Sequence, residues 1–323
     1  MTPVGEILRD EIAKSGPIRF HRFMEAALYH PELGYYCRDR DPFGQHGDYY
    51  TAEQIQPTFG VLIASYLDSL MREEGIREYS VVELGAGRSE MRDAFGGSSY
   101  VPVEVGDKLP GRITGAVFAN EFFDALPVDV VRKRGGECVL ERVGWHGDRF
   151  RWVRGETAGE ELVSYVERFA AEAPADALVE VNLDALHWVD QISAVLERGV
   201  VLVIDYGYRS RELVRFPEGT LMSYHRHRAL EDVLADPGER DITAHVNFSA
   251  LEQRAGQCGL ESVRFETLGR MTLRAGEQDE FASVFGDSQG AERERRTRQL
   301  KSLTFGMGDT FLTLALHRGG QAQ

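Results

Sequence analysis

Two kinds of hydrophobic pattern divide the chain. In the first 75 residues, apolar side chains recur every three or four positions, which predicts helices over 3–15, 20–29 and 59–70. From residue 79 onward, short apolar runs alternate with turns and helical segments. This order predicts an N-terminal helical layer over residues 1–75, followed by a doubly wound α/β sheet domain over residues 76–323.

Strands of the predicted sheet are short and mostly apolar. The run at 200–205 shows no alternation, which is typical of a strand buried on both faces. Residues 128–155 interrupt the α/β order with three strand-like segments joined by glycine-containing turns, which predicts an inserted antiparallel β segment. The other predicted strands are 81–84, 100–105, 116–119, 219–224, 260–268 and 310–317. The other predicted helical segments are 90–95, 162–171, 183–196, 249–258 and 291–303, and Ser249 is expected to cap the helix 249–258.

A tight turn, Gly85-Ala86-Gly87, follows the first predicted strand. Glycines at such a turn let the backbone approach a ligand closely. Glu104 ends the next strand, where a carboxylate can accept hydrogen bonds from ribose hydroxyls. A dinucleotide site favours a small residue at the sixth position of this motif, where the chain has Glu90. The pattern therefore favours S-adenosylmethionine (SAM) over NAD, and a turn without a ligand is the alternative.

In the SAM interpretation, each polar residue of this region has an expected contact. Gly85 and Gly87 pass close to the methionine part of the cofactor, and Glu83 helps to fix its ammonium group. Glu104 accepts the ribose hydroxyls.

A second group of polar residues follows two other predicted strands. Asn120, Glu121 and Asp124 come after the strand 116–119, and Asp205 and Tyr206 end the strand 200–205. Because ligands bind at the carboxyl edge of open α/β sheets, we expect these residues to line one cleft with the glycine turn. The alternative is a polar loop that buries two phenylalanines in the core.

Composition narrows the possible partners. The chain has 323 residues and a net charge of −15, with no basic patch, so we expect no nucleic-acid partner. No apolar run reaches the roughly 20 residues that span a membrane. The start of the chain lacks a signal-peptide pattern, and three scattered cysteines fit a reducing compartment, so we expect a cytoplasmic protein. No residues have metal-ligand spacing, and we expect no metal site.

A series of short motifs runs along nearly the whole chain. The segments are Phe23–Tyr36, Gly47-Asp48 with Thr51-Ala52, Glu83–Arg88, Ala119–Pro127, Ile204–Gly207, Gly219–Leu221 and Asp241–Val246. Together they resemble the MidA family of SAM-dependent methyltransferases, which is related to a mitochondrial complex I assembly factor that methylates an arginine, and the most specific segment is Ala119–Pro127. The resemblance implies a seven-stranded SAM-methyltransferase-type sheet, SAM as cofactor, and a protein substrate with an accessible arginine.

The resemblance assigns further roles. Glu121 and Asp124 are expected to grip the protonated guanidinium, and His245 is expected to remove a proton or contact the substrate. Asn120 is expected on the cofactor side. Substrate-binding roles are expected for Asp48, Thr51, Asp205 and Tyr206.

The glycine turn departs from the family pattern. Ala86 replaces the usual proline, Ser89-Glu90 replaces a Gly-Thr pair, and the stretch between Gly87 and Asn120 is short. These departures lie on the cofactor side. They leave open an assembly factor that binds SAM, or has lost it, and acts without turnover. A small-molecule methyltransferase or another nucleotide-dependent enzyme on the same sheet is a further alternative.

Overall fold

The computed structural model describes residues 1–38, 57–95, 99–225 and 228–319. The chain forms two compact units. The first unit comprises residues 1–50, 124–186 and 208–250, and the second unit comprises residues 51–123, 187–207 and 251–323. Neither unit is continuous in sequence, because the chain passes between them five times.

The first unit begins with two helices whose ends follow from local sequence. Helix α1 (Pro3–Ser15) starts with proline at its first position, and the Thr2 hydroxyl caps it by accepting the Gly5 N–H at 3.0 Å. Helix α2 (Phe20–Tyr29) ends before Pro31, because the residue preceding a proline avoids the helical region. Both predicted helices are confirmed.

The predicted inserted segment forms three antiparallel strands, which confirms that expectation. β5 pairs antiparallel with β6, and β6 pairs antiparallel with β7. Two further strands, β1 and β8, extend this sheet on either side, so that it has five strands in the order β1-β6-β5-β8 with β7 beside β6. The bounds are β1 (Ile18–Arg19), β5 (Asp129–Arg134), β6 (Glu137–His146), β7 (Arg149–Thr157) and β8 (Leu178–Val181).

The rest of the first unit packs around this sheet. One apolar cluster joins α1 and α2 to β5 and β6, and another joins helix α5 (Glu160–Phe169) to β8. A second small sheet has three strands in the order β11-β10-β12. The strands of this small sheet are β10 (Met222–His225), β11 (Arg228–Leu230) and β12 (Asp241–Thr243). The remaining elements of the unit are the 3₁₀ helix η2 (Ser210–Arg215) and the short strand β13 (Val246–Asn247).

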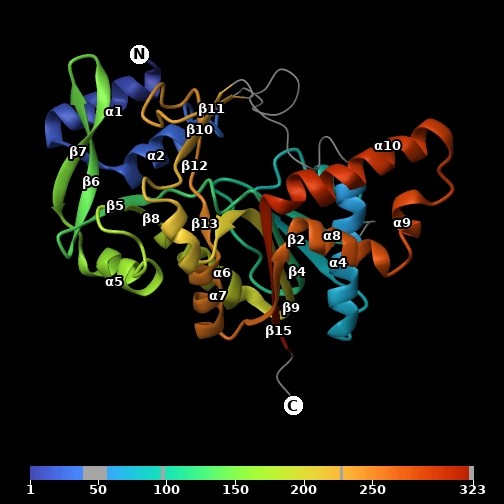
Figure 1. Cartoon of the computed structure of the whole chain (residues 1–323). Coiled ribbons are helices and arrows are strands. Elements are labelled where there is room, and N and C mark those ends of the chain that lie inside the picture. The colour runs from blue at the N-terminus through green and yellow to red at the C-terminus, as the bar shows by residue number, and fades with distance from the viewer. Residues whose placement is uncertain (39–56, 96–98, 226–227, 320–323) are drawn as a thin grey trace. The chain divides into compact units, whose positions relative to one another are not determined.

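The second unit contains the main strands of a seven-stranded mixed sheet. Along six of these strands the order is β14-β15-β9-β4-β2-β3, as Figure 1 shows in part. β3, β2, β4 and β9 run parallel, and β15 lies antiparallel between β9 and β14. The bounds are β2 (Ser80–Leu84), β3 (Ser99–Val103), β4 (Ile113–Asn120), β9 (Leu196–Tyr208), β14 (Glu261–Thr267) and β15 (Phe311–Arg318). The predicted α/β sheet of the SAM-methyltransferase type is confirmed.

Helices cover this sheet through one large apolar cluster. Helix α4 (Pro57–Glu73) lies beside α8 (Leu268–Glu277), as Figure 1 shows, and both pack against apolar side chains of β4 and β9. The N-terminal boundary predicted near residue 75 does not coincide with the two units, because α4 packs with the sheet whereas α1 and α2 pack with β5 and β6. The other helical elements are α6 (Leu183–Val195), α7 (Phe248–Gln257), α9 (Ala282–Phe285), α10 (Gly290–Lys301), η3 (Ser302–Gly306) and η4 (Met307–Asp309).

Two local expectations were wrong. The segment after the glycine turn is not a helix over 90–95 but a single 3₁₀ turn, η1 (Glu90–Arg92). Helix α7 is capped by Asn247, whose Oδ1 accepts the Ala250 N–H at 3.3 Å, while the Ser249 hydroxyl accepts the Ser210 N–H instead. Among the described residues, no helix has the length and apolar character needed to cross a bilayer.

Candidate active site

The glycine turn follows β2 directly, and both of its glycines are exposed. Gly85 has φ +64° and Gly87 has φ +53°, in the left-handed region that favours glycine. The Gly85 N–H donates to the Val103 carbonyl at 2.9 Å, which ties the turn to β3. A Cβ added to Gly85 would lie 3.1 Å from Cδ2 of Phe122. The backbone is therefore exposed to a close-fitting ligand at this point.

Glu104 lies just beyond β3, on the exposed side of the same turn. Its carboxylate accepts a backbone hydrogen bond from Gly87, and its own N–H donates to Asp107 Oδ2 at 3.0 Å. Partial desolvation, together with the charge of Asp107, raises the pKa of Glu104, and the bond from Gly87 opposes that rise. An accessible acceptor beside a glycine turn suits the hydroxyls of a ribose.

Glu83 lies on β2 and is only 5% exposed. The hydroxyl of Tyr100, on the adjacent strand β3, donates a hydrogen bond to its Oε2. Burial, followed by this bond and the charge of Glu83, raises the pKa of Tyr100. The structure thus shows Glu83 paired with Tyr100 across β2 and β3, and its contact with a cofactor ammonium group stays a prediction.

The end of β4 holds a strained residue. Glu121 has φ +49°, which is uncommon for a residue other than glycine and costs about 1–3 kcal/mol. Its N–H donates to the Ile204 carbonyl on β9 at 3.0 Å. The side-chain amide of Asn120, which is 9% exposed, donates to Glu121 Oε1 at 3.4 Å. These contacts fix the backbone of Glu121 at the carboxyl edge of the sheet.

Asp205 ends the buried part of β9 and is fully buried itself. Its Oδ2 accepts the Phe123 N–H and its Oδ1 accepts the Tyr206 N–H, each at 2.9 Å. Tyr206 packs its ring on Phe311 of β15, with ring centroids 4.0 Å apart. The structure shows Asp205 organising the loops at this edge, and the substrate-binding roles of Asp205 and Tyr206 stay predictions.

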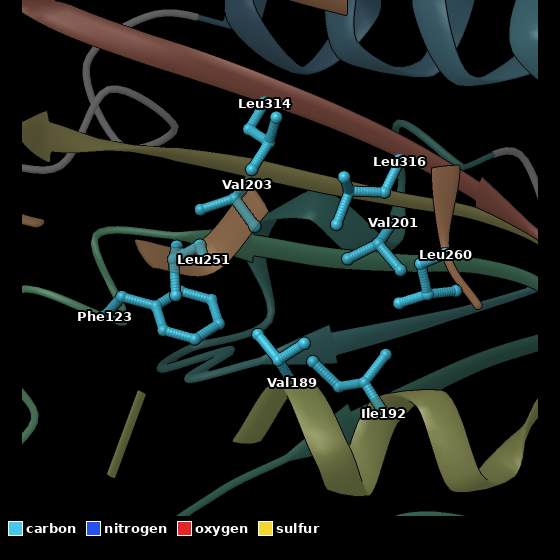
Figure 2. A pocket seen from close by; sticks show the side chains of 9 residues that line it. All are labelled: Phe123, Val189, Ile192, Val201, Val203, Leu251, Leu260, Leu314 and Leu316. Atoms are coloured by element: carbon cyan, nitrogen blue, oxygen red, sulfur yellow. The ribbon is translucent and has the colours of Figure 1, made fainter. Parts of the chain in front are cut away.

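A small apolar void lies beneath Phe123 in the second unit. Figure 2 shows its lining, which consists only of hydrocarbon side chains, and its volume is about 10 Å³. A water molecule needs at least that space and two or more polar partners, so the void stays dry. The void is a packing gap, and Phe123 belongs to the core. The lining residues are Phe123, Val189, Ile192, Val201, Val203, Leu251, Leu260, Leu314 and Leu316.

Asp124 lies in the first unit and is 4% exposed. Burial, followed by the charge of the nearby Asp241, raises the pKa of Asp124 to about 8. Asp241 is also buried, and its Oδ1 accepts the Tyr36 hydroxyl at 2.8 Å. The pair is further tied by the Ala244 N–H, which donates to the Asp124 carbonyl at 2.9 Å. Our sequence analysis included Asp241 in a family segment but did not identify it as the partner of Asp124.

His245 is half-buried in the first unit. Its backbone N–H donates to Thr220 Oγ1 at 3.0 Å, and its ring meets the ring of Phe216 edge-on, with centroids 5.4 Å apart. Burial lowers the pKa of His245, so the imidazole is neutral at pH 7 and able to accept a proton. Its catalytic role stays a prediction.

The predicted residues fall into three groups. Adjacent parallel strands β2, β4 and β9 bring Gly85, Asn120, Glu121 and Asp205 to one edge within the second unit. Asp124 and His245 belong to the first unit. Asp48 and Thr51 lie outside the described residues. Within the described ranges, no three carboxylate, cysteine or histidine side chains converge as a metal site would require.

Comparison with known proteins identifies the family. The family model of S-adenosyl-L-methionine-dependent methyltransferases matches residues 92–266, which are 175 of the 323 residues. The chain belongs to this family. The glycine turn with Ala86 and Ser89-Glu90 precedes the matched segment, whereas most of the short stretch between Gly87 and Asn120 lies within it.

Relatives and solved structures extend the match to most of the chain. Protein arginine methyltransferase NDUFAF7 homolog of Drosophila melanogaster is 27% identical over 77% of this chain and 69% of its own. Human protein arginine methyltransferase NDUFAF7 is 26% identical over 79% of this chain and 69% of its own. A Burkholderia thailandensis protein bound to S-adenosyl-homocysteine is 28% identical with a TM-score of 0.85, covering 99% of this chain and 92% of that one.

The cofactor of this methyltransferase is SAM, and the second unit fits it. The turn at Gly85 and Gly87, which we term the cofactor cradle, is exposed with positive φ at both glycines, and a Cβ on Gly85 would crowd the Phe122 ring at 3.1 Å. Glu104 presents an exposed acceptor one strand away. These residues would hold the methionine and ribose parts of the cofactor. Phe122, the side chain that lies against Gly85, was not predicted as a site residue, because adjacent apolar rings within a polar loop are more typical of the core.

Proposed function

We propose that this chain transfers a methyl group from SAM to an arginine side chain of a protein substrate. The family gives the reaction type. The arginine acceptor is supported by the relatives named protein arginine methyltransferases, which match over about three quarters of this chain. The net charge of −15 also favours a basic segment of a protein partner over an acidic one.

The observation that carries the proposal is the strained backbone of Glu121. Strained residues persist only where their surroundings over-determine them, and they cluster at active sites. Glu121 ends β4, which pairs with β2, the strand that leads into the glycine turn. An acidic side chain is therefore fixed on the strand next to the cofactor cradle.

A carboxylate in this position suits the chemistry of arginine. The guanidinium stays protonated and delocalised at neutral pH, which makes its nitrogens weak nucleophiles. SAM supplies an electrophilic methyl group on its sulfonium. A carboxylate that accepts guanidinium N–H bonds orients one nitrogen and offsets the positive charge, so that catalysis is mainly positioning.

One of the two predicted acids is unsuited to a charged contact. The pKa of Asp124 is raised to about 8, so that carboxyl is protonated at pH 7 and cannot offset a cation by itself. We therefore assign the charged contact to Glu121. The neutral imidazole of His245 is the candidate that accepts a proton.

We also propose that the protein is located in the cytoplasm. Cys37, Cys138 and Cys258 are all free thiols, which fits the reducing cytoplasm that we predicted from their spacing.

Methyl transfer can be tested directly. Purified protein would be incubated with methyl-tritiated SAM and extract from cells that lack the gene, and labelled proteins would be analysed by mass spectrometry. We expect label on arginine. Glu121→Gln should lower kcat by roughly 100-fold, since it removes one electrostatic contact, and should leave the Kd for SAM within about twofold. Glu197→Gln, on the opposite end of β9 and paired with Arg112 at 2.7 Å, is the matched control.

Each contrary result has a distinct meaning. Label on lysine, or in the small-molecule fraction, would reject arginine as the acceptor. Tight SAM binding without any labelled product would favour an assembly factor that binds the cofactor without turnover. Equal losses of kcat and SAM affinity in Glu121→Gln would move Glu121 from the substrate to the cofactor.

A further inference from the structure

Phe122 lies directly against the glycine turn of the second unit. Its Cδ2 is the atom nearest to a Cβ built on Gly85, at 3.1 Å. The neighbouring Phe123 is 1% exposed and lines the apolar void in Figure 2, whereas Phe122 keeps part of its surface accessible. Phe123 therefore belongs to the core, whereas Phe122 lies against the glycine turn.

The backbone around Phe122 is fixed from both sides. On one side, Glu121 adopts φ +49° and its N–H donates to the Ile204 carbonyl at 3.0 Å. On the other, the Phe123 N–H donates to buried Asp205 at 2.9 Å. Local strain held by such bonds marks a position whose orientation matters to function. The residue between the two anchors is Phe122.

The ring of Phe122 is also held by a second aromatic residue. Trp188, on helix α6, meets it at an interplanar angle of 87° with ring centroids 5.0 Å apart. Phe123 meets the same ring at 89° and 5.3 Å. Perpendicular contacts of this kind are favourable between aromatic rings and fix the ring plane. Phe122 and Trp188, which we term the aromatic pair, thus pack edge to face, with the Phe122 ring beside Gly85.

We propose that the aromatic pair is a wall of the cofactor site and that the Phe122 ring contacts the sulfonium end of SAM. The methionine part of the cofactor is expected over Gly85, next to this ring. A sulfonium carries a positive charge, and aromatic faces attract cations within about 6 Å. The wall therefore favours charged SAM over its neutral product S-adenosyl-homocysteine. This inference rests on the cofactor of the family and not on the proposed arginine acceptor.

Ligand affinity separates a cation-binding ring from a merely structural one. Calorimetry would give the Kd for SAM and for S-adenosyl-homocysteine in the wild-type chain, Phe122→Leu and Phe122→Tyr. We expect Phe122→Leu to raise the Kd for SAM by about five- to tenfold and the Kd for S-adenosyl-homocysteine by less than about twofold. Phe122→Tyr keeps an aromatic face and should retain the wild-type ratio of the two Kd values. The control Phe285→Leu removes a half-buried ring on α9 and should leave both unchanged.

An equal rise of the two Kd values in Phe122→Leu would overturn the sulfonium contact.

A second experiment keeps Phe122 unchanged, so its result does not depend on whether Phe122→Leu folds. The other tryptophans, Trp145 and Trp152, lie on β6 and β7 of the first unit and are replaced together by phenylalanine. The emission of Trp188 should then change on saturation with SAM. Unchanged emission at a SAM concentration that calorimetry shows to be saturating would place the aromatic pair outside the cofactor site.

Discussion

The backbone N–H of Phe123 donates a 2.9 Å hydrogen bond to Oδ2 of Asp205, although 82 residues separate them. Asp205 also accepts the N–H of Tyr206. One buried carboxylate thus joins the chain after β4 to the end of β9, and it determines the direction in which Phe122 and Glu121 leave the sheet. Asp205 thus holds the loops of the candidate site, together with the bond from the Glu121 N–H to the Ile204 carbonyl.

Replacing Asp205 should therefore destabilise the second unit. Asp205→Ala removes the acceptor of two backbone N–H groups in a fully buried place, and we expect a loss of about 2–4 kcal/mol in the free energy of unfolding. Asp205→Asn keeps one oxygen acceptor and should lose less. Urea unfolding monitored by circular dichroism measures both. A loss in Asp205→Ala below about 0.5 kcal/mol would show that the carboxylate does not organise these loops.

The turn at Gly85 gives a prediction on cofactor binding. Gly85→Ala places a Cβ 3.1 Å from Phe122 at a backbone φ of +64°. We expect this variant to lose about 1–2 kcal/mol in the free energy of unfolding, because of backbone strain, and to bind SAM with a Kd at least tenfold higher. Gly135→Ala is a matched control, because Gly135 has φ +59° and no atom within 4 Å of the added Cβ. It should lose similar stability and bind SAM normally. Similar SAM affinities in the two variants would contradict a cofactor cradle at Gly85.

Glu104 should contribute to SAM affinity by accepting hydrogen bonds from the ribose hydroxyls. Glu104→Gln exchanges a charged acceptor for a neutral one, and we expect SAM affinity to fall by roughly tenfold. Glu90→Gln alters an exposed carboxylate on the turn that follows the glycines and should leave affinity unchanged. Calorimetric titration of both variants provides the comparison. Wild-type affinity in Glu104→Gln would remove Glu104 from the site.

The buried Asp124 predicts that stability falls as pH rises. Its carboxyl ordinarily titrates at 3.8, but burial and the charge of Asp241 raise its pKa to about 8 in the folded chain. The folded state therefore binds a proton more tightly than the unfolded state. This contribution to stability is fully present below about pH 4 and declines until the pH exceeds 8.

Asp124→Asn tests this pH dependence. The amide cannot ionise, so the melting temperature of this variant should fall less between pH 6 and pH 8.5 than that of the wild type. Asp10→Asn changes a carboxylate that is 59% exposed and should follow the wild-type curve. Parallel curves for wild type and Asp124→Asn would show that Asp124 is ionised throughout this range.

Local sequence determined much of the fold. Helical periodicity and proline positions located α1, α2 and α4, because these signals act within one or two turns of chain. The apolar run at 200–205 predicted a strand buried on both faces, and β9 is such a strand. The glycine turn and the acid after the second strand were also predictable, since positive φ and strand ends depend on neighbouring residues.

Only the tertiary structure decided how the polar residues are used. The sequence placed Asp124, Asp205 and Glu121 near strand ends, but their burial, partners and backbone strain depend on residues 80 or more positions away. The same holds for Phe122, whose contact with Gly85 and Trp188 follows from strand order and from the packing of α6. Hydrophobic pattern fixes which face of an element is buried. The packing of the whole chain decides which distant side chain meets that face. The same packing buries Asp124 and raises the pKa of its carboxyl.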